Sequence, residues 1–157
     1  MIIEVGQQAP DFFLYDSDKN KITLSDYQGK NVLLLFFPLA FTSVCTAELC
    51  AVRDDIGRYN SAHVQVFGIS VDTPQTLSVF KKEQQYNFPL LSDFNKNVSA
   101  LYGCQYASFG PMDMHGIAKR AAFVIDKAGI VQYAEVLENP GNVPNFDAIQ
   151  ACIAKLN

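Results

Sequence analysis

Cys45 is the residue of this chain whose position best suits covalent chemistry. It comes after an apolar, strand-like run at 31–37 that stops at Pro38. A short hydroxyl-bearing turn follows, and Cys45 then falls in the first turn of a predicted helix. The N-terminus of a helix presents unpaired N–H groups and a partial positive charge, which stabilise a thiolate over a thiol. Because a thiolate is a strong nucleophile near neutral pH, the sequence predicts a reactive sulfur here.

The helix that begins near Cys45 has one apolar face, whose members recur at helical spacing: Cys45, Leu49, Val52, Ile56 and Tyr59. Cys45 is therefore expected to face the sheet at the carboxyl end of a strand, where open α/β sheets place their ligands. The same position also suits a buried structural cysteine, because free cysteine is among the most often buried residue types. Cys50 is expected on the opposite, wetter side of the helix with Arg53 and Asp54.

The other cysteines and the two histidines give weaker signals. Cys152 shares the apolar face of the last predicted helix, which favours packing over chemistry. Cys104 lies in a less regular segment, where it suits either role. His63 and His115 are single histidines that form no metal-binding pattern, so the sequence predicts no metal site.

Strand and helix patterns alternate along the chain. A β-hairpin is expected over 12–24, followed by one helical turn at 25–28. The further predicted elements are strands at 32–37, 64–71, 121–125 and 130–136, and helices at 43–59, 74–86, 95–102 and 146–156. Apart from the hairpin and the 88–120 region, the order is the β-α-β-α-β-β-α of the thioredoxin fold. We therefore expect an α/β, thioredoxin-like fold with a mixed central sheet, flanking helices and an N-terminal β-hairpin.

Length and charge exclude several classes of function. Residues 1–157 are expected to form a single domain, because no internal repeat or linker-like stretch interrupts them. The net charge is −4, and no cluster of lysine and arginine suggests a nucleic-acid partner. No apolar stretch approaches the length of a membrane span, and the first residues lack a signal-peptide pattern. We therefore expect a cytoplasmic protein with no membrane partner, in a compartment where cysteines tend to be catalytic.

The residues around Cys45 match a known pattern. Pro38, Thr42 and Cys45 have the spacing Pro-x-x-x-Thr/Ser-x-x-Cys; Glu48 follows three residues later, and Arg120 begins a later strand. In these positions the chain resembles the peroxiredoxins, thiol peroxidases of the AhpC/TSA superfamily with an elaborated thioredoxin fold. The resemblance extends over nearly the whole chain, from the segment that ends in Ala-Pro-Asp-Phe near the N-terminus to the final helix.

The resemblance implies a role for each of these residues. Cys45 is the implied peroxidatic thiolate, which attacks one oxygen of the peroxide. Thr42 is implied to hydrogen-bond the bound peroxide, and Pro38 to shield the site. Arg120 is implied to lie across the pocket, where it stabilises the thiolate and the separating oxygens, and Glu48 to orient Arg120. No metal or organic cofactor is implied, because the sulfur itself carries the electrons.

Cys50 lies five residues after Cys45. The segment 36–42 looks most like the alkyl-hydroperoxidase-E-like subgroup, whereas Cys50 looks more like the Q-type, or bacterioferritin-comigratory, subgroup. We predict that Cys50 attacks the sulfenic acid of Cys45. Five helical residues separate two Cα atoms by roughly 8.7 Å, and a disulfide tolerates at most about 7 Å, so the helix has to unwind. In the alternatives, Cys104 resolves after a movement of its segment, or an external thiol reduces Cys45 directly.

The resemblance also implies the partners. These are hydrogen peroxide or organic hydroperoxides as substrates and a thioredoxin- or glutaredoxin-like protein as reductant, and both homodimers and monomers occur among related subgroups. Two other functions fit a cysteine-bearing thioredoxin fold. One is a non-enzymatic redox sensor or holdase, and the other is a metallochaperone that binds copper through Cys45 and Cys50. A thioredoxin-type disulfide oxidoreductase is disfavoured, because Cys-x-x-Cys is absent.

Overall fold

The structure is a computed structural model that describes residues 2–156, and a seven-stranded mixed sheet forms its centre. The strands are β1 (Phe13–Asp16), β2 (Lys21–Thr23), β3 (Asn31–Phe36), β4 (Val64–Ser70), β5 (Leu90–Ser92), β6 (Arg120–Ile125) and β7 (Val131–Leu137). Their order in the sheet is β2-β1-β5-β4-β3-β6-β7. β4 runs parallel to β3 and β5, and the other neighbours are antiparallel. This arrangement confirms the predicted thioredoxin-like fold.

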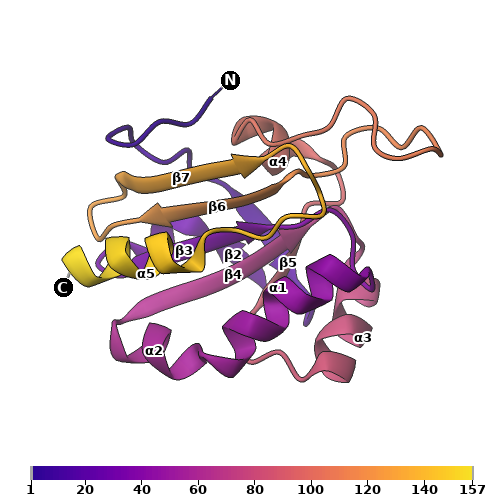
Figure 1. Cartoon of the computed structure of the whole chain (residues 1–157). Coiled ribbons are helices and arrows are strands. Elements are labelled where there is room, and N and C mark those ends of the chain that lie inside the picture. The colour runs from indigo at the N-terminus through magenta and orange to yellow at the C-terminus, as the bar shows by residue number, and fades with distance from the viewer. Residues whose placement is uncertain (1, 157) are drawn as a thin grey trace.

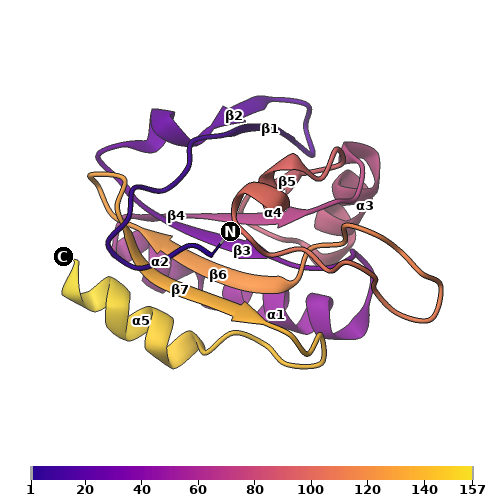
Figure 2. The same cartoon turned by 90° about the horizontal axis from the view of Figure 1, so that it is seen from above.

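Helices cover both faces of the sheet (Figures 1 and 2). They are α1 (Ser43–Asp54), α2 (Ile56–Ser61), α3 (Pro74–Gln84), α4 (Asn97–Leu101) and α5 (Phe146–Lys155), with a 3-10 turn, η1, at Leu24–Tyr27. Buried side chains of α1, α2, α3 and α5 pack on one face, and those of α4, η1 and the N-terminal segment pack on the other. No helix in the described part of the chain is long and apolar enough to cross a membrane.

The central strand β3 sets the geometry of the site. All six of its residues are buried, and they alternate between the two faces of the sheet, so its continuous apolar run is what a strand covered on both sides requires. β6 lies antiparallel beside it, with Phe36 opposite Ala121. The start of β6, which is Arg120, is therefore level with the end of β3, from which the chain turns into α1.

Two predictions about the elements are wrong. The predicted helix 43–59 is interrupted at Asp55, whose φ of −115° and ψ of 17° leave the helical region, so α1 and α2 are separate helices. Aspartate favours helices weakly, and Gly57 follows closely. β5 was absent from the prediction, because three residues are too few to show a strand period. The predicted strands at 121–125 and 130–136 form the antiparallel pair β6–β7, and the Thr73 hydroxyl caps α3 by accepting from the Thr76 N–H.

A long connection at 103–119 extends away from the sheet before β6 (Figure 1). It is held at its base by the hydroxyl of Tyr106, which donates to the carbonyl of Glu138 at 2.7 Å. A bridge between Phe109 and Met114 closes its tip. The connection thereby brings Phe109 back toward the N-terminal end of α1, where it lines a cavity described below.

Candidate active site

Cys45 lies in the first turn of α1 and is only 1% exposed, facing the sheet as predicted. Thr42 occupies the N-cap position with extended backbone angles, but its hydroxyl makes no capping hydrogen bond. It donates instead to the carbonyl of Leu39 at 2.9 Å. Because its proton is engaged inside the turn, the Thr42 oxygen can offer a lone pair to a ligand.

The turn between β3 and α1 is anchored from the neighbouring strand. A carboxylate oxygen of Asp72, just after β4, accepts hydrogen bonds from the Ala40 N–H at 2.8 Å and from the Ser70 hydroxyl at 2.7 Å. Phe41 has a φ of +67°, which non-glycine residues rarely adopt, and its ring packs on Phe80 with 4.9 Å between centroids. The shape of the turn is thus fixed by contacts outside α1.

Arg120 lies directly against the sulfur of Cys45. Its Nη1 is 3.2 Å from Cys45 Sγ, and its Nη2 donates to the carbonyl of Pro140 at 2.9 Å. The arginine is 1% exposed, although an arginine at the start of a strand is usually on the surface. The guanidinium is thereby placed to donate a charge-assisted hydrogen bond to the sulfur and to lie beside negative charge there.

Glu48 is buried one turn after Cys45 and approaches the same nitrogen of Arg120. Its Oε2 is 3.6 Å from Arg120 Nη1, an ion-pair distance too long for a hydrogen bond, and neither carboxyl oxygen has a hydrogen-bond partner among the described residues. Burial raises the pKa of Glu48 to about 8, although the charge of Arg120 lowers it, and the nearby Glu135 adds a smaller rise. Burial thus favours the protonated carboxyl group, which leaves the arginine charge available to the sulfur.

The raised pKa of Glu48 predicts a pH-dependent stability. The unfolded chain loses this proton near pH 4.5 and the folded chain near pH 8, so stability is full below pH 4.5 and falls as the pH rises through this window. We expect the free energy of unfolding to fall relative to that of Glu48→Gln, by at most about 1.4 kcal/mol per pH unit. The difference is measured by denaturant titrations at several pH values. Both proteins carry Cys45→Ser, so that this thiol makes no contribution to the comparison. A difference that stays constant with pH contradicts the prediction.

A cavity of about 240 Å³ opens beside Cys45. Pro38, Thr42, Cys45 and Arg120 all contribute to its wall, so four of the predicted site residues come together there. Glu48 contacts Arg120 but does not line the cavity. A larger groove of about 560 Å³ lies along β1 and α4, but among the described residues no cysteine, histidine, lysine or arginine lines it. The small cavity is therefore where a ligand meets the sulfur.

Sequence reasoning missed the parts of the wall that come from distant loops. Phe109 and the pair Pro140–Gly141 complete the cavity, and the carbonyl of Pro140 holds Arg120 in place. Only the Pro-Gly pair gives a signal in the sequence, and that signal indicates a turn rather than a site. Asp72 was missed for the same reason, because an aspartate before a helix reads as ordinary turn chemistry.

The other candidates lie away from this cavity. All four cysteines are free thiols. Cys104 is fully buried, and burial raises the pKa of its thiol to about 12, which favours packing. Burial also raises the pKa of Cys152, whose thiol donates to the carbonyl of Gln132. His115 is exposed and contacts Asp113 at 2.9 Å, and His63 is exposed at the start of β4. No group of three potential metal ligands occurs among the described residues.

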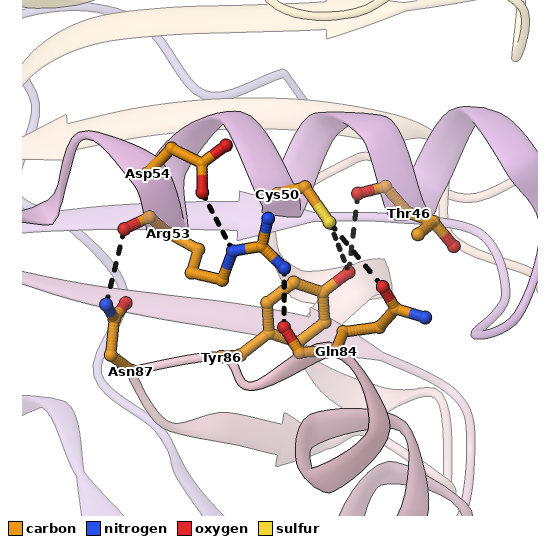
Figure 3. Close-up of polar contacts among 7 residues, drawn as sticks. All are labelled: Thr46, Cys50, Arg53, Asp54, Gln84, Tyr86 and Asn87. Atoms are coloured by element: carbon orange, nitrogen blue, oxygen red, sulfur yellow. Dashed lines mark hydrogen bonds and ion pairs between the residues drawn. The ribbon is translucent and has the colours of Figure 1, made fainter.

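Cys50 is half-buried on the side of α1 that faces α3 (Figure 3). Its sulfur lies 3.7 Å from Gln84 Oε1 and 3.7 Å from the hydroxyl of Tyr86. The predicted wetter side of the helix is thus partly covered here, while Asp54 on the same side is exposed. Cys45 and Cys50 occupy separate surroundings in the folded helix, as the predicted spacing requires.

Comparisons with known proteins place the chain in a family. The model of the AhpC/TSA family matches residues 5–134. Alkyl hydroperoxide reductase E of Mycobacterium tuberculosis is 41% identical over 145 residues, which cover 90% of each protein. Peroxiredoxin Bcp of Escherichia coli K12 is 38% identical over 132 residues, covering 83% of this chain and 84% of that protein. The crystal structure of peroxidoxin BcpB from Mycobacterium tuberculosis has a TM-score of 0.86 at 28% identity and covers 99% of each chain. Together with the placement of Cys45 against Arg120, these matches show that the chain belongs to the AhpC/TSA family, the peroxiredoxins.

Proposed function

We propose that this thiol-dependent peroxidase reduces hydroperoxides at Cys45 with the help of Thr42 and Arg120, and that Cys50 resolves the oxidised sulfur. The observation that carries the proposal is the contact of 3.2 Å between Arg120 Nη1 and the buried sulfur of Cys45, at the wall of a cavity. Membership of the peroxiredoxins makes the chain a peroxidase, and this contact supports Cys45 as the sulfur that reacts.

In the first step the thiolate of Cys45 attacks one peroxide oxygen. A sulfur–oxygen bond forms, the oxygen–oxygen bond breaks, and the electron pair of the broken bond leaves with the alkoxide or hydroxide, which takes up a proton from water. The sulfur is oxidised to a sulfenic acid and the peroxide is reduced to an alcohol or water. Arg120 is placed to stabilise the negative charge on the separating oxygens.

The other cavity residues orient the peroxide in this proposal. The Thr42 hydroxyl donates to Leu39, so its oxygen accepts the hydrogen of the peroxide O–H group. Arg120 donates to the peroxide from the other side, which aligns the oxygen–oxygen bond with the sulfur. Pro38 covers the sulfur from one wall and contributes no N–H group that would compete for the substrate. Glu48 helps to position the guanidinium through its contact with Nη1 at 3.6 Å.

In the second step the thiol of Cys50 attacks the sulfenic acid of Cys45, which releases water and forms a disulfide. A dithiol protein of the thioredoxin or glutaredoxin class then reduces this disulfide by thiol–disulfide exchange. A cytoplasmic location is part of the proposal, since such reductants keep thiols reduced there. A homodimer is also part of it, because the exposed side chains of Phe41, Met112 and Val143 lie in loops near the cavity.

The resolving role of Cys50 is tested by oxidation with one equivalent of peroxide. Mass spectrometry is expected to show a Cys45–Cys50 disulfide, and circular dichroism a loss of helical signal as α1 unwinds. Cys50→Ser is expected to keep the sulfenic acid and its helicity, while Cys152→Ser forms the disulfide like the wild type. A wild-type protein that accumulates only the sulfenic acid contradicts this role and favours a one-cysteine enzyme reduced by an external thiol.

The metallochaperone alternative does not suit the site. Copper binding through Cys45 and Cys50 needs two converging sulfurs, whereas these two contact different elements of the fold. The guanidinium of Arg120 also repels a cation at Cys45. A redox sensor or holdase would be oxidised once, whereas the peroxidase consumes many equivalents of peroxide when a dithiol reductant is supplied.

A further inference from the structure

The C-terminal ends of α1 and α3 are tied to each other (Figure 3). Arg53, in the last turn of α1, donates from Nη1 to the carbonyl of Gln84 at 2.6 Å, and Gln84 is the final residue of α3. In return, the side-chain amide of Asn87 donates to the carbonyl of Arg53 at 3.2 Å. Each contact satisfies a carbonyl group that a helix C-terminus leaves unpaired, so the far end of α1 is held in place.

Tyr86 contacts α1 one turn earlier, between these ties and the active-site end. Its hydroxyl donates to the carbonyl of Thr46 at 3.3 Å and lies 3.7 Å from the sulfur of Cys50. Thr46 and Cys50 are four residues apart, so they define one turn of the helix and share a backbone hydrogen bond. Tyr86 therefore bridges this single turn from outside (Figure 3).

The position of the Tyr86 hydroxyl is fixed by its ring. The residue is 4% exposed, and its ring lies against Phe80 and Phe88 with centroid distances of 5.1 and 5.6 Å. Burial raises the pKa of Tyr86 well above its usual range, so the hydroxyl keeps its proton and remains a donor. The fold thus holds a permanent hydrogen-bond donor against the turn that links Cys50 to Thr46.

We propose that Tyr86 is a positioning residue for the resolving step, a latch that holds the Thr46–Cys50 turn closed and sets how fast Cys50 reaches Cys45. The proposal rests on the proposed role of Cys50. Cys45 and Cys50 can meet only if the helix between them opens. Because the ties at Arg53 and Asn87 hold the end of α1, the opening falls in the turn that Tyr86 bridges.

The latch decides between two fates of the sulfenic acid. If the turn opens, the Cys50 thiol attacks the Cys45 sulfenic acid, which gives a disulfide and water. If it stays closed, a second hydroperoxide oxidises the sulfenic acid to a sulfinic acid and is itself reduced to an alcohol or water. A slower opening therefore makes the enzyme more sensitive to inactivation by its own substrate.

The test is Tyr86→Phe, which keeps the ring packing and removes the hydroxyl. Rapid-quench alkylation with mass spectrometry measures the rates of sulfenic acid and disulfide formation after one equivalent of peroxide. The disulfide rate is expected to rise about two- to tenfold, the range for loss of one hydrogen bond. The ratio of disulfide rate to sulfenic acid rate rises with it, and so does the peroxide concentration that half-inactivates the enzyme.

Tyr102→Phe is the matched control. Tyr102 is also buried and its hydroxyl donates to the carbonyl of Pro10 at 2.7 Å, but it belongs to the core on the other face of the sheet. The Tyr102→Phe variant should lose stability without a change in the ratio of disulfide rate to sulfenic acid rate. If Tyr86→Phe forms the disulfide at the wild-type rate, or more slowly, the latch is refuted while Cys50 remains the resolving residue. If the wild type forms no Cys45–Cys50 disulfide, the proposed function of Cys50 fails first, and the latch with it.

Discussion

Replacement of Cys45 by serine is expected to reduce peroxidase turnover to the uncatalysed background. A serine hydroxyl does not ionise near neutral pH and is a far weaker nucleophile than a thiolate, so no covalent intermediate forms. The fold should survive, because the serine is nearly isosteric and can still accept the Arg120 hydrogen bond. Peroxide consumption with a dithiol reductant in excess measures the loss, and a thermal melt checks the fold.

Cys152→Ser is the control for this experiment. Its thiol is half-buried on α5 and faces the carbonyl of Gln132, on an element that contributes no residue to the cavity. The turnover of the Cys152→Ser protein should remain close to that of the wild type. Substantial turnover by Cys45→Ser would mean that another cysteine carries the reaction, and the mechanism at Cys45 would be wrong.

Replacement of Arg120 by methionine is expected to slow peroxide reduction by about a hundredfold to a thousandfold, the usual cost of removing one donor from a charge-stabilising site. Two effects contribute, since the buried thiolate loses its cation and the separating oxygens lose theirs. Stopped-flow measurement of the second-order rate with peroxide tests this, together with the ultraviolet absorbance of the thiolate at neutral pH.

We expect Arg120→Met to lose much less in folding stability than in the rate of peroxide reduction. Methionine fills much of the arginine volume, but removing one partner of a buried ion pair is destabilising when the other charge is left uncompensated. Glu48 can remain protonated without the cation, because its pKa is already raised by burial. Arg120→Lys keeps the charge but not the fixed fork that reaches both Cys45 and Pro140, so an intermediate rate is expected. A methionine variant with the wild-type rate would remove Arg120 from the site.

The sequence predicted those parts of the molecule that depend on local pattern. The buried run at β3, the first-turn position of Cys45 and the apolar face of α1 follow from periodicity, and the structure confirms them. The approach of Arg120 to Cys45 followed from the family resemblance alone. It depends on the antiparallel register of β6 against β3, which joins residues 75 positions apart in the chain.

What the sequence could not show depends on contacts between distant segments. The burial of Glu48 follows from the packing of α1 against the sheet, although a glutamate near a helix N-terminus is normally solvated. The contacts of Tyr86 with Thr46 and Cys50 arise because Gln85 adopts a left-handed conformation at the end of α3, which turns the chain back toward α1. The family pattern implied a role for Glu48 but not its burial, and Tyr86 belongs to no motif, so only its surroundings in the fold reveal it.

The anchoring of the 38–42 turn by Asp72 bears on how the enzyme recovers between cycles. Because Ala40 is held from the end of β4, the wall that contains Pro38 and Thr42 keeps its support during the proposed opening of α1. Return to the reactive state then requires only that the first turns of α1 reform next to the anchored 38–42 turn. Helix relaxation takes about a microsecond or less, which is far shorter than a typical turnover. If Cys50 resolves Cys45 as proposed, the protein unfolds part of its active site in every round and still presents a finished substrate pocket at the start of the next.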